Sequence, residues 1–396
     1  MYSEFKAYIG VLLCFLAAAI LLIGGLVYGC VSTIGEDYEE LPIESLYPVY
    51  YRVFSAMEGH ALAITAEGTI IGWGSNADGQ LGNPGAAFHQ PFIWVADLDA
   101  AAVFGWRDFS GAVDRAGNVW VWGGNWEGNL ARPNREPTRL YELENVKYIW
   151  VNNNRMAVLT RCGNAYIRTQ DSELELLDLN VATISAGPTY MLFLTVDGEV
   201  YGIGDNSMGQ LGGNIGESAV SIVPLGISNI RAISAGAMNA SAVTIDGYVY
   251  QWGQIVSFDQ LDDGELVEFD RVRTPRRLGY VDHVMAISSG NRFTVAVRND
   301  GTVWGWGVNE LGVLGDYGED SDIAYPRMLG GFSNVIDVSA SGAHFLALQG
   351  GDELFPELGT IWGMGHIFGG ELGSGNNIPT IITGSIILGE ENYYEI

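Results

Sequence analysis

Short apolar strands separated by small and polar turn residues fill most of the chain, after one unbroken apolar segment near the N-terminus. In stretches such as HALAI from residue 60 and TVAVR from residue 294, apolar residues alternate with small or polar residues. Turn residues bound each stretch. This period of two is typical of a half-buried β-strand. Glycine interrupts every longer segment after residue 31, so helical periodicity is absent and the pattern predicts an all-β domain.

One phrase recurs along the chain: an apolar strand, an acidic residue followed by glycine, and a second strand that ends in Trp-Gly. Clear copies run from His60 to Gly82, Ser110 to Leu130, Tyr190 to Gly212 and Phe293 to Gly315, and weaker ones from Met156 to Arg168, Ser241 to Gly253 and Leu358 to Gly373. The turn glycines recur about every 48 residues: Gly68, Gly117, Gly163, Gly198, Gly247, Gly301 and Gly359. A period of about 40–50 residues with several strand signals is typical of propeller blades. The sequence therefore predicts a seven-bladed β-propeller over residues 47–396.

Each part of the repeat has a physical role that needs those residue types. Glycine at the turn supplies the positive φ that a two-residue hairpin turn requires. The repeat tryptophans are expected to pack between neighbouring sheets, where one such side chain buries about 150–250 Å²; they are Trp73, Trp122, Trp252 and Trp306. Small-residue stretches such as Ile184-Ser185-Ala186-Gly187 precede most copies. We expect them where strands converge near the propeller axis.

The tail of the repeat is its most specific part. Residues 75–82 read SNADGQLG and residues 205–212 read DNSMGQLG, each after a Ser-Ala-Gly or equivalent stretch, a strand and an acidic-Gly turn. This arrangement resembles the repeat of the regulator of chromosome condensation (RCC1-type) family. The resemblance implies a closed seven-bladed ring in which the terminal segments complete one shared blade, with residues 379–388 as the closing strand. It also implies that the ring serves as a platform on which other proteins dock.

The third copy departs from the pattern. Arg161-Cys162-Gly163-Asn164 replaces the acidic-Gly turn, Arg168 stands near the tryptophan position, and the interval to the next turn glycine is short. We expect this blade to be shortened or distorted, either through tolerated drift or as a loop remodelled for a partner.

Residues 8–31 carry no charge, and a helix of that length covers about 36 Å, enough for the hydrocarbon layer of a membrane. The sequence thus predicts a short tail at 1–7, a transmembrane anchor at 8–31 and an acidic linker at 32–46. Lys6 on the N-terminal side favours an internal N-terminus and an extracytoplasmic propeller. Alternatively, Val27-Tyr28-Gly29-Cys30 resembles a bacterial lipoprotein signal, with Cys30 as the lipidated residue. Either reading attaches the propeller to a cell membrane.

The formal net charge of −28 argues against nucleic acid as a partner, because phosphate backbones attract clustered Lys and Arg. A protein partner with a basic patch fits better. Two acidic loops are candidate contacts, and the aromatic Trp126 is a third; the acidic residues are Asp259, Asp262, Asp263, Glu265, Glu268 and Asp270 in one loop and Asp316, Glu319 and Asp320 in the other. A solvated acidic face is the alternative. Neither loop has the EF-hand order of ligands, so we assign no metal.

No motif of a catalytic or cofactor site occurs in the chain, and we expect neither a cofactor nor a catalytic residue. His60 and His344 occupy matching positions in their repeats, which favours a structural role. The three cysteines, Cys14, Cys30 and Cys162, imply no disulfide framework or metal pair, and Cys162 is expected to be a small buried or half-buried residue.

Together these features predict a membrane-anchored, extracytoplasmic and monomeric propeller that binds a protein partner and is not an enzyme. Two alternatives stay open. One is a purely structural surface protein. The other is a propeller lyase or hydrolase with acidic residues in the central channel, which needs titratable side chains that converge at one mouth.

Overall fold

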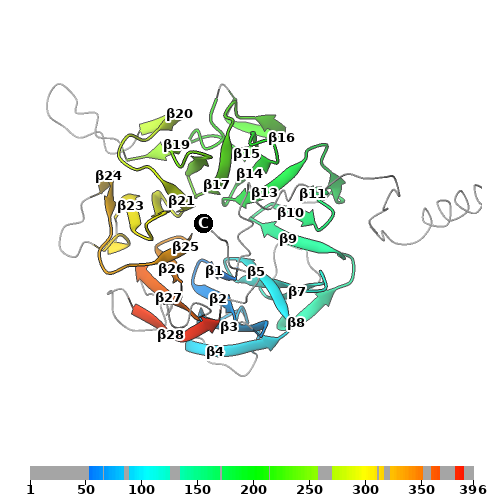
Figure 1. Ribbon diagram of the computed structural model, residues 1–396. Coiled ribbons are helices and arrows are strands. Elements are labelled where there is room, and N and C mark those ends of the chain that lie inside the picture. The colour runs from blue at the N-terminus through cyan, green and yellow to red at the C-terminus, as the bar shows by residue number, and fades with distance from the viewer. Residues whose placement is uncertain are drawn as a thin grey trace, which may run out of the picture.

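A computed structural model describes residues 53–65, 67–83, 89–124, 134–169, 172–213, 215–256, 270–309, 312–315, 322–350, 358–365 and 380–387. These residues form seven four-stranded antiparallel sheets arranged as a ring (Figure 1). The four strands of each sheet follow one another in the sequence, so each sheet is one blade of the predicted propeller. No helix in these ranges is long and apolar enough to cross a membrane. The predicted anchor at 8–31 and linker at 32–46 lie outside the described residues.

The first strand of each blade lies nearest the ring axis and the fourth lies at the rim (Figure 1). Blade 1 comprises β1 (Phe54–Ala56), β2 (His60–Ile64), β3 (Thr69–Ser75) and β4 (His89–Asp97), and blade 2 comprises β5 (Ala100–Trp106), β6 (Phe109–Asp114), β7 (Val119–Gly123) and β8 (Asn134–Leu140). Blade 3 comprises β9 (Val146–Val151), β10 (Arg155–Thr160), β11 (Ala165–Thr169) and β12 (Glu175–Leu176), and blade 4 comprises β13 (Val181–Ala186), β14 (Tyr190–Thr195), β15 (Val200–Asp205) and β16 (Ser218–Pro224).

Blade 5 comprises β17 (Ile230–Ala235), β18 (Asn239–Thr244), β19 (Val249–Ile255) and β20 (Asp270–Arg277). Blade 6 comprises β21 (Val284–Ser289), β22 (Phe293–Arg298), β23 (Val303–Gly307) and β24 (Ile323–Met328), and blade 7 comprises β25 (Val335–Ala340), β26 (His344–Gln349), β27 (Leu358–Gly365) and β28 (Thr380–Ile387).

In blades 1 to 6 the hairpin between the second and third strands has a three-residue loop, one residue longer than the predicted two-residue turn. In blade 4 the Thr195 amide donates to Glu199 O at 2.9 Å, and the Gly198 amide donates to Thr195 O at 3.0 Å. Only the glycine takes a positive φ, 78°, which gives a turn followed by a glycine bulge. The other turn glycines from Gly68 to Gly301 have φ values of 73–85°. Gly359 differs, because it lies within β27 opposite Ile386 and is a strand residue rather than a turn glycine.

Each interface between neighbouring blades is called a seam here, and the turn glycines contribute to most seams. The Gly198 carbonyl accepts the amide of Ile230, the first residue of blade 5, at 3.1 Å. The same bond joins Gly68 to Ala100, Gly117 to Val146, Gly247 to Val284 and Gly301 to Val335. A glycine is needed because a Cβ at Gly68 would lie 2.7 Å from the Asp99 Cα. The turn therefore locks one blade onto the next.

Serine hydroxyls form a second set of seam contacts near the axis. Ser185 Oγ accepts the Ala235 amide at 2.9 Å, and the equivalent serines of blades 5, 6 and 7 accept the amides of Ser289, Ala340 and Ala56 at 2.8–3.0 Å. These bonds join blade 4 through blade 7 to blade 1. The small-residue stretches thus lie near the axis, as the sequence predicts, and their serines bond neighbouring blades.

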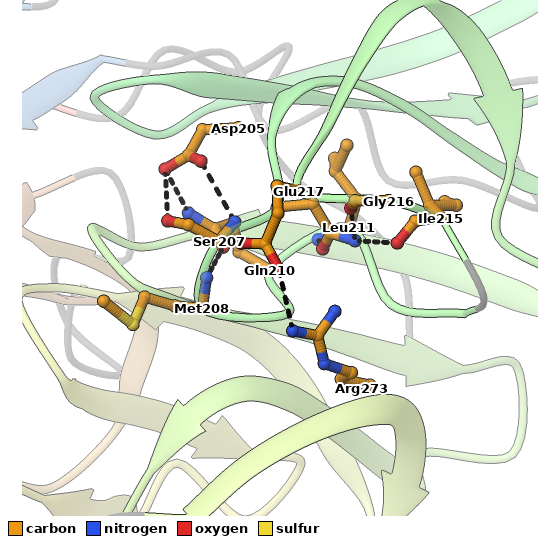
Figure 2. Close-up of polar contacts among 10 residues, drawn as sticks. Asp205, Ser207, Met208, Gln210, Leu211, Ile215, Gly216, Glu217 and Arg273 are labelled. Carbon is orange, nitrogen blue, oxygen red and sulfur yellow. Dashed lines mark hydrogen bonds and ion pairs between the residues drawn. The ribbon is translucent and has the colours of Figure 1, made fainter.

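The repeat tail and the repeat tryptophan form the third set. Trp252 is fully buried, and its indole Nε1 donates to Gln210 O in the tail of blade 4 at 2.8 Å. Trp122 makes the equivalent bond to Gln80 O at 2.9 Å. Figure 2 shows how the tail is folded: Asp205 accepts from Ser207 and Gln210, and the Gln210 carboxamide oxygen accepts the Met208 amide at 2.8 Å. The tail therefore presents a carbonyl to the next blade's tryptophan.

The ring closes between complete blades. Blade 1 takes all four of its described strands from residues 54–97, and blade 7 takes its four from residues 335–387. The shared blade that the family resemblance implied is therefore wrong for the described strands, and residues 380–387 form the outer strand of blade 7. A core that includes Phe54 and Trp73 from blade 1 and Leu346 from blade 7 fills this seam.

Blade 3 is the exception to the repeat. Its outer strand β12 has two residues, as the short third repeat predicts. Arg168 lies opposite Met156 at the position that Trp252 occupies opposite Ala240 in blade 5. No atom lies within 4 Å of a Cβ built at Gly163, so this turn does not press against blade 4. In the seam between blades 3 and 4, Asn152 Nδ2 donates to Gly187 O and Tyr190 O, and further bonds run from the Asn153 amide to Pro188 O and from Arg155 Nη1 to Thr189 O.

Candidate binding surfaces

The central channel is a cavity of about 350 Å³ to which the first strands of all seven blades contribute. Its lining differs around the ring. At equivalent inner positions blade 1 and blades 4 to 7 carry serine, whereas blade 2 carries Phe104 and blade 3 carries Trp150. Glu58 and Arg107 also line the cavity, 3.8 Å apart and largely exposed. The described residues of this lining include no convergent set of acids of the kind that a glycosidase uses.

Two buried histidines lie in the blades on either side of the ring closure. His60 Nε2 lies 2.7 Å from the Ser110 hydroxyl of blade 2, and its Nδ1 has no partner. His344 is equally buried, and its Nε2 is unpaired. Burial, and for His60 also the nearby His344, lowers the pKa of His60 to about 3, and burial lowers the pKa of His344 to about 4. Both imidazoles are neutral at neutral pH and act as packing residues, in agreement with their matching repeat positions.

All but one of the predicted partner contacts fall outside the described residues. These are Asp259, Asp262, Asp263, Glu265 and Glu268 in the first acidic loop, Asp316, Glu319 and Asp320 in the second, and Trp126. Asp270 begins β20, where it pairs with Ile255. Among the described residues, no group of three or more His, Cys, Asp or Glu side chains is placed to hold a metal ion.

Arginines on the outer strand of blade 5 are a charged feature that was not predicted from the sequence. β20 carries Arg271, Arg273, Arg276 and Arg277, all exposed. The signal was present in the sequence, since four of the 19 basic residues of the chain lie within seven positions. It was hidden by the acidic loop directly before the strand and by the overall charge of −28.

Cys162 corrects a further expectation. It lies in the turn between β10 and β11, is exposed rather than buried, and is disulfide-bonded. Its Sγ also accepts from Asn145 Nδ2 at 3.1 Å. The other two cysteines of the chain, Cys14 and Cys30, including the predicted lipidation residue, lie outside the described residues.

Comparison with known families agrees with this architecture. The model described as the regulator of chromosome condensation (RCC1) repeat matches residues 300–348, and a second model of that description matches residues 58–80, 181–210 and 284–313. These matches place RCC1 repeats in blades 1, 4, 6 and 7, in agreement with the resemblance of the repeat tails. The RCC1 match at 300–348 begins in blade 6 and ends within β26 of blade 7, so it crosses a seam and includes the inter-blade contacts described above.

Several relatives share most of the RCC1-repeat propeller. The ultraviolet-B receptor UVR8 of Arabidopsis thaliana is 26% identical over 372 residues, which cover 83% of this chain and 81% of the receptor. The human E3 ubiquitin-protein ligase HERC2 is 28% identical over 77% of this chain, but the match spans only 6% of that much longer protein. Prp20p from Saccharomyces cerevisiae superposes with a TM-score of 0.65 at 18% identity, covering 84% of this chain and 94% of Prp20p. The last likeness concerns the fold alone.

Proposed function

We propose that this RCC1-repeat propeller is a non-enzymatic docking module for another protein, held at the extracytoplasmic side of a membrane by residues 8–31. The observation that carries the proposal is the bonded ring itself. Hydrogen bonds link successive blades at the turn, at the axis and at the tail, which makes a rigid support for the connecting loops. Loops on a rigid scaffold are where binding residues concentrate.

The relatives support the same class of function. One solved structure of Saccharomyces cerevisiae Prp20p is reported together with the binding of Prp20p to Gsp1p and histones. Another contains yeast RCC1 (Prp20) bound to Kap60. Those partners belong to that protein. What we carry over is the use of the ring as a surface for protein partners. The acidic loops at 259–270 and 316–322, together with Trp126, are the proposed contacts for a basic patch on the partner.

The anchor is either an uncleaved helix or a lipid on Cys30. The mass of the mature N-terminus distinguishes these two forms. A thiol reagent that cannot cross membranes, applied to intact cells after reduction, labels Cys162 if the propeller is outside and leaves it unlabelled if it is inside.

A cross-linking pull-down tests the docking function directly. The full-length chain, purified in detergent, is presented to a membrane extract at low and high salt. We expect a partner that is released by salt and lost in the Asp262→Asn/Asp263→Asn variant. The matched control is Glu173→Gln/Glu175→Gln, which removes two exposed acids from blade 3 and leaves the partner bound. Equal capture by all three forms contradicts the assignment of the acidic loop.

A further inference from the structure

The connections between the first and second strands of the blades open onto one face of the ring. Neighbouring strands of a blade are antiparallel, so the connection between the third and fourth strands leaves the blade at the same edge. The turn between the second and third strands lies at the other edge, where Gly198 O accepts the amide of Ile230 at the start of blade 5. We call the first face the loop face. It surrounds the mouth of the central cavity, which Glu58, Arg107 and Asn291 line from first-to-second connections.

The segments proposed as partner contacts begin and end on the loop face. Each joins a third strand to a fourth: the acidic loops connect β19 to β20 and β23 to β24, and the segment with Trp126 connects β7 to β8. The central cavity therefore lies in the middle of the face to which the docking function assigns the partner.

One half of the cavity wall is aromatic and held in place by neighbouring groups. Trp106 is half-buried, and its indole Nε1 donates to Asn153 Oδ1 of blade 3 at 2.9 Å. Phe104 lies against the backbone of Gly111, where any Cβ would overlap the Phe104 ring. Trp150 of blade 3 completes this half. Since these rings are already ordered, a ligand loses little free energy in ordering them.

The other half of the wall, from blades 4 to 7, consists of small and polar residues. A Cβ at Gly236 would lie 2.5 Å from Gly290 O, so neighbouring blades meet here backbone to backbone. Ser288 and Ser339 are half-buried in this half, and each Oγ accepts an amide of the next blade. Neither hydroxyl has an acceptor among the described residues, so each can donate a hydrogen bond to a group in the cavity.

The two halves together fit a side chain with an aromatic body and a polar tip that accepts hydrogen bonds. The volume of about 350 Å³ lies near the lower end of the ~300–1,000 Å³ typical of ligand sites, which suits one inserted side chain. Glu58 and Arg107 at the mouth lie 3.8 Å apart and offset each other's charge, which favours an uncharged side chain. Tyrosine meets these conditions, whereas the tryptophan indole only donates hydrogen bonds.

We propose that the central cavity receives a tyrosine side chain of the partner, flanked in the partner by basic residues. The proposal rests on the docking function above and adds to it the residue that enters the ring. Tyrosine is among the residue types that dominate binding energy, and such residues fill pockets near the centre of an interface. The basic flanks follow from the acidic loops that begin and end on the same face.

Three labelled peptides test the proposal on the purified chain in detergent at low salt. Fluorescence anisotropy compares Arg-Arg-Gly-Tyr-Gly-Arg-Arg with the versions that carry phenylalanine or alanine in place of tyrosine. We expect the tyrosine peptide to bind about tenfold more tightly than the alanine peptide and more tightly than the phenylalanine peptide.

A pair of glycine variants locates the tyrosine. Gly342 lines the cavity and a Cβ there meets no atom within 4 Å, so Gly342→Trp has room to fill the mouth. We expect it to reduce the preference for tyrosine over alanine to within about twofold. The control Gly330→Trp also has open space, but it lies between β24 and β25 on the opposite face and leaves the preference unchanged. Unchanged thermal unfolding shows that each variant is folded.

Several results overturn the proposal. They are equal affinity for the tyrosine and alanine peptides, binding of no peptide, and a tyrosine preference that persists in Gly342→Trp. Tighter binding of the phenylalanine peptide overturns the choice of tyrosine, because the serine hydroxyls then contribute nothing. Asp262→Asn/Asp263→Asn separates this proposal from the acidic loops: it weakens all three peptides by the same factor if the first loop attracts them, and it leaves the tyrosine preference in place.

Discussion

The seam between blades 4 and 5 and the seam between blades 3 and 4 solve the same packing problem with different chemistry. The first uses the turn glycine Gly198, the hydroxyl of Ser185 and the Gln210 carbonyl that receives Trp252. The second has an open turn at Gly163 and uses the Asn152 side-chain amide, with additional bonds from Asn153 and Arg155 to carbonyls of blade 4. A repeat contact can therefore be lost when other polar groups supply hydrogen bonds across the seam.

The largest expected effect comes from removing the buried indole in the regular seam. Trp252→Ala leaves a large cavity and an unpaired Gln210 carbonyl, and we expect it to lower the free energy of unfolding by about 3–5 kcal/mol. The matched change in blade 3, Arg168→Ala, removes a half-buried side chain from the same repeat position and costs less than about 1 kcal/mol. Urea unfolding followed by circular dichroism measures both. Equal losses contradict the difference between the seams.

Acid is expected to destabilise the protein at blades 1 and 7, where the ring closes. The pKa values of His60 and His344 are lowered to about 3 and about 4, so the folded chain binds fewer protons than the unfolded chain below pH 6.5. Stability is thus fully present above pH 6.5 and is lost as the pH falls toward 4, by about 2 kcal/mol for each histidine at pH 5. Denaturant titrations between pH 7 and 5 measure the slope.

A pair of variants assigns that slope to the buried histidines. His60→Gln/His344→Gln removes both titrating groups and is expected to flatten the pH dependence. His283→Gln removes a largely exposed histidine that directly precedes β21 of blade 6. We expect this change to leave the pH dependence of stability unaltered. If the free energy of unfolding of the double variant still falls with pH as in the wild type, other groups cause the acid sensitivity.

A smaller difference in stability is expected between variants of the 3–4 seam and the 4–5 seam near the ring axis. Asn152 is fully buried and bonds to Gly187 O, Tyr190 O and the amides of Asn154 and Arg155, so Asn152→Ala is expected to cost about 2–3 kcal/mol. Ser185→Ala in the regular seam removes one of several bonds and costs about 1 kcal/mol. Thermal unfolding of the two variants side by side checks the order. A larger loss at Ser185 reverses the comparison.

The sequence predicts the blades better than it predicts their contacts. Strand alternation and the turn glycines recur within each repeat, so the seven sheets and the position of Trp252 follow from local pattern. The bond from Trp252 to Gln210 joins residues 42 positions apart and depends on how two sheets meet, which local pattern does not specify. For the same reason the closure between blades 7 and 1 was expected to share strands but does not.

The binding surface shows a different limit. The net charge predicts that the chain presents an acidic surface to its partner, but it does not say where charged residues lie. It therefore gave no sign of the four arginines of β20. The disulfide state of Cys162 was not predicted, because no spacing pattern pairs cysteines that lie far apart in the chain. The acidic loops and Trp126 stay predictions, since they lie outside the described residues.

The three sets of seam bonds described above share one direction, whereas the bonds from the amides of Asn153, Ala237 and Asn291 to the carbonyls of Pro188, Gly290 and Ser341 run the opposite way. Gly198 O, Ser185 Oγ and Gln210 O are acceptors on the earlier blade, and Ile230, Ala235 and Trp252 supply the donors from the later one. These acceptors are synthesised before their donors, so in the nascent chain they are bonded only after the next blade has formed. Blade 7 alone meets a neighbour made long before, when the Ala56 amide finally reaches Ser339. Completion of the ring therefore comes last during synthesis, and truncation near the C-terminus leaves blade 1 without its partner.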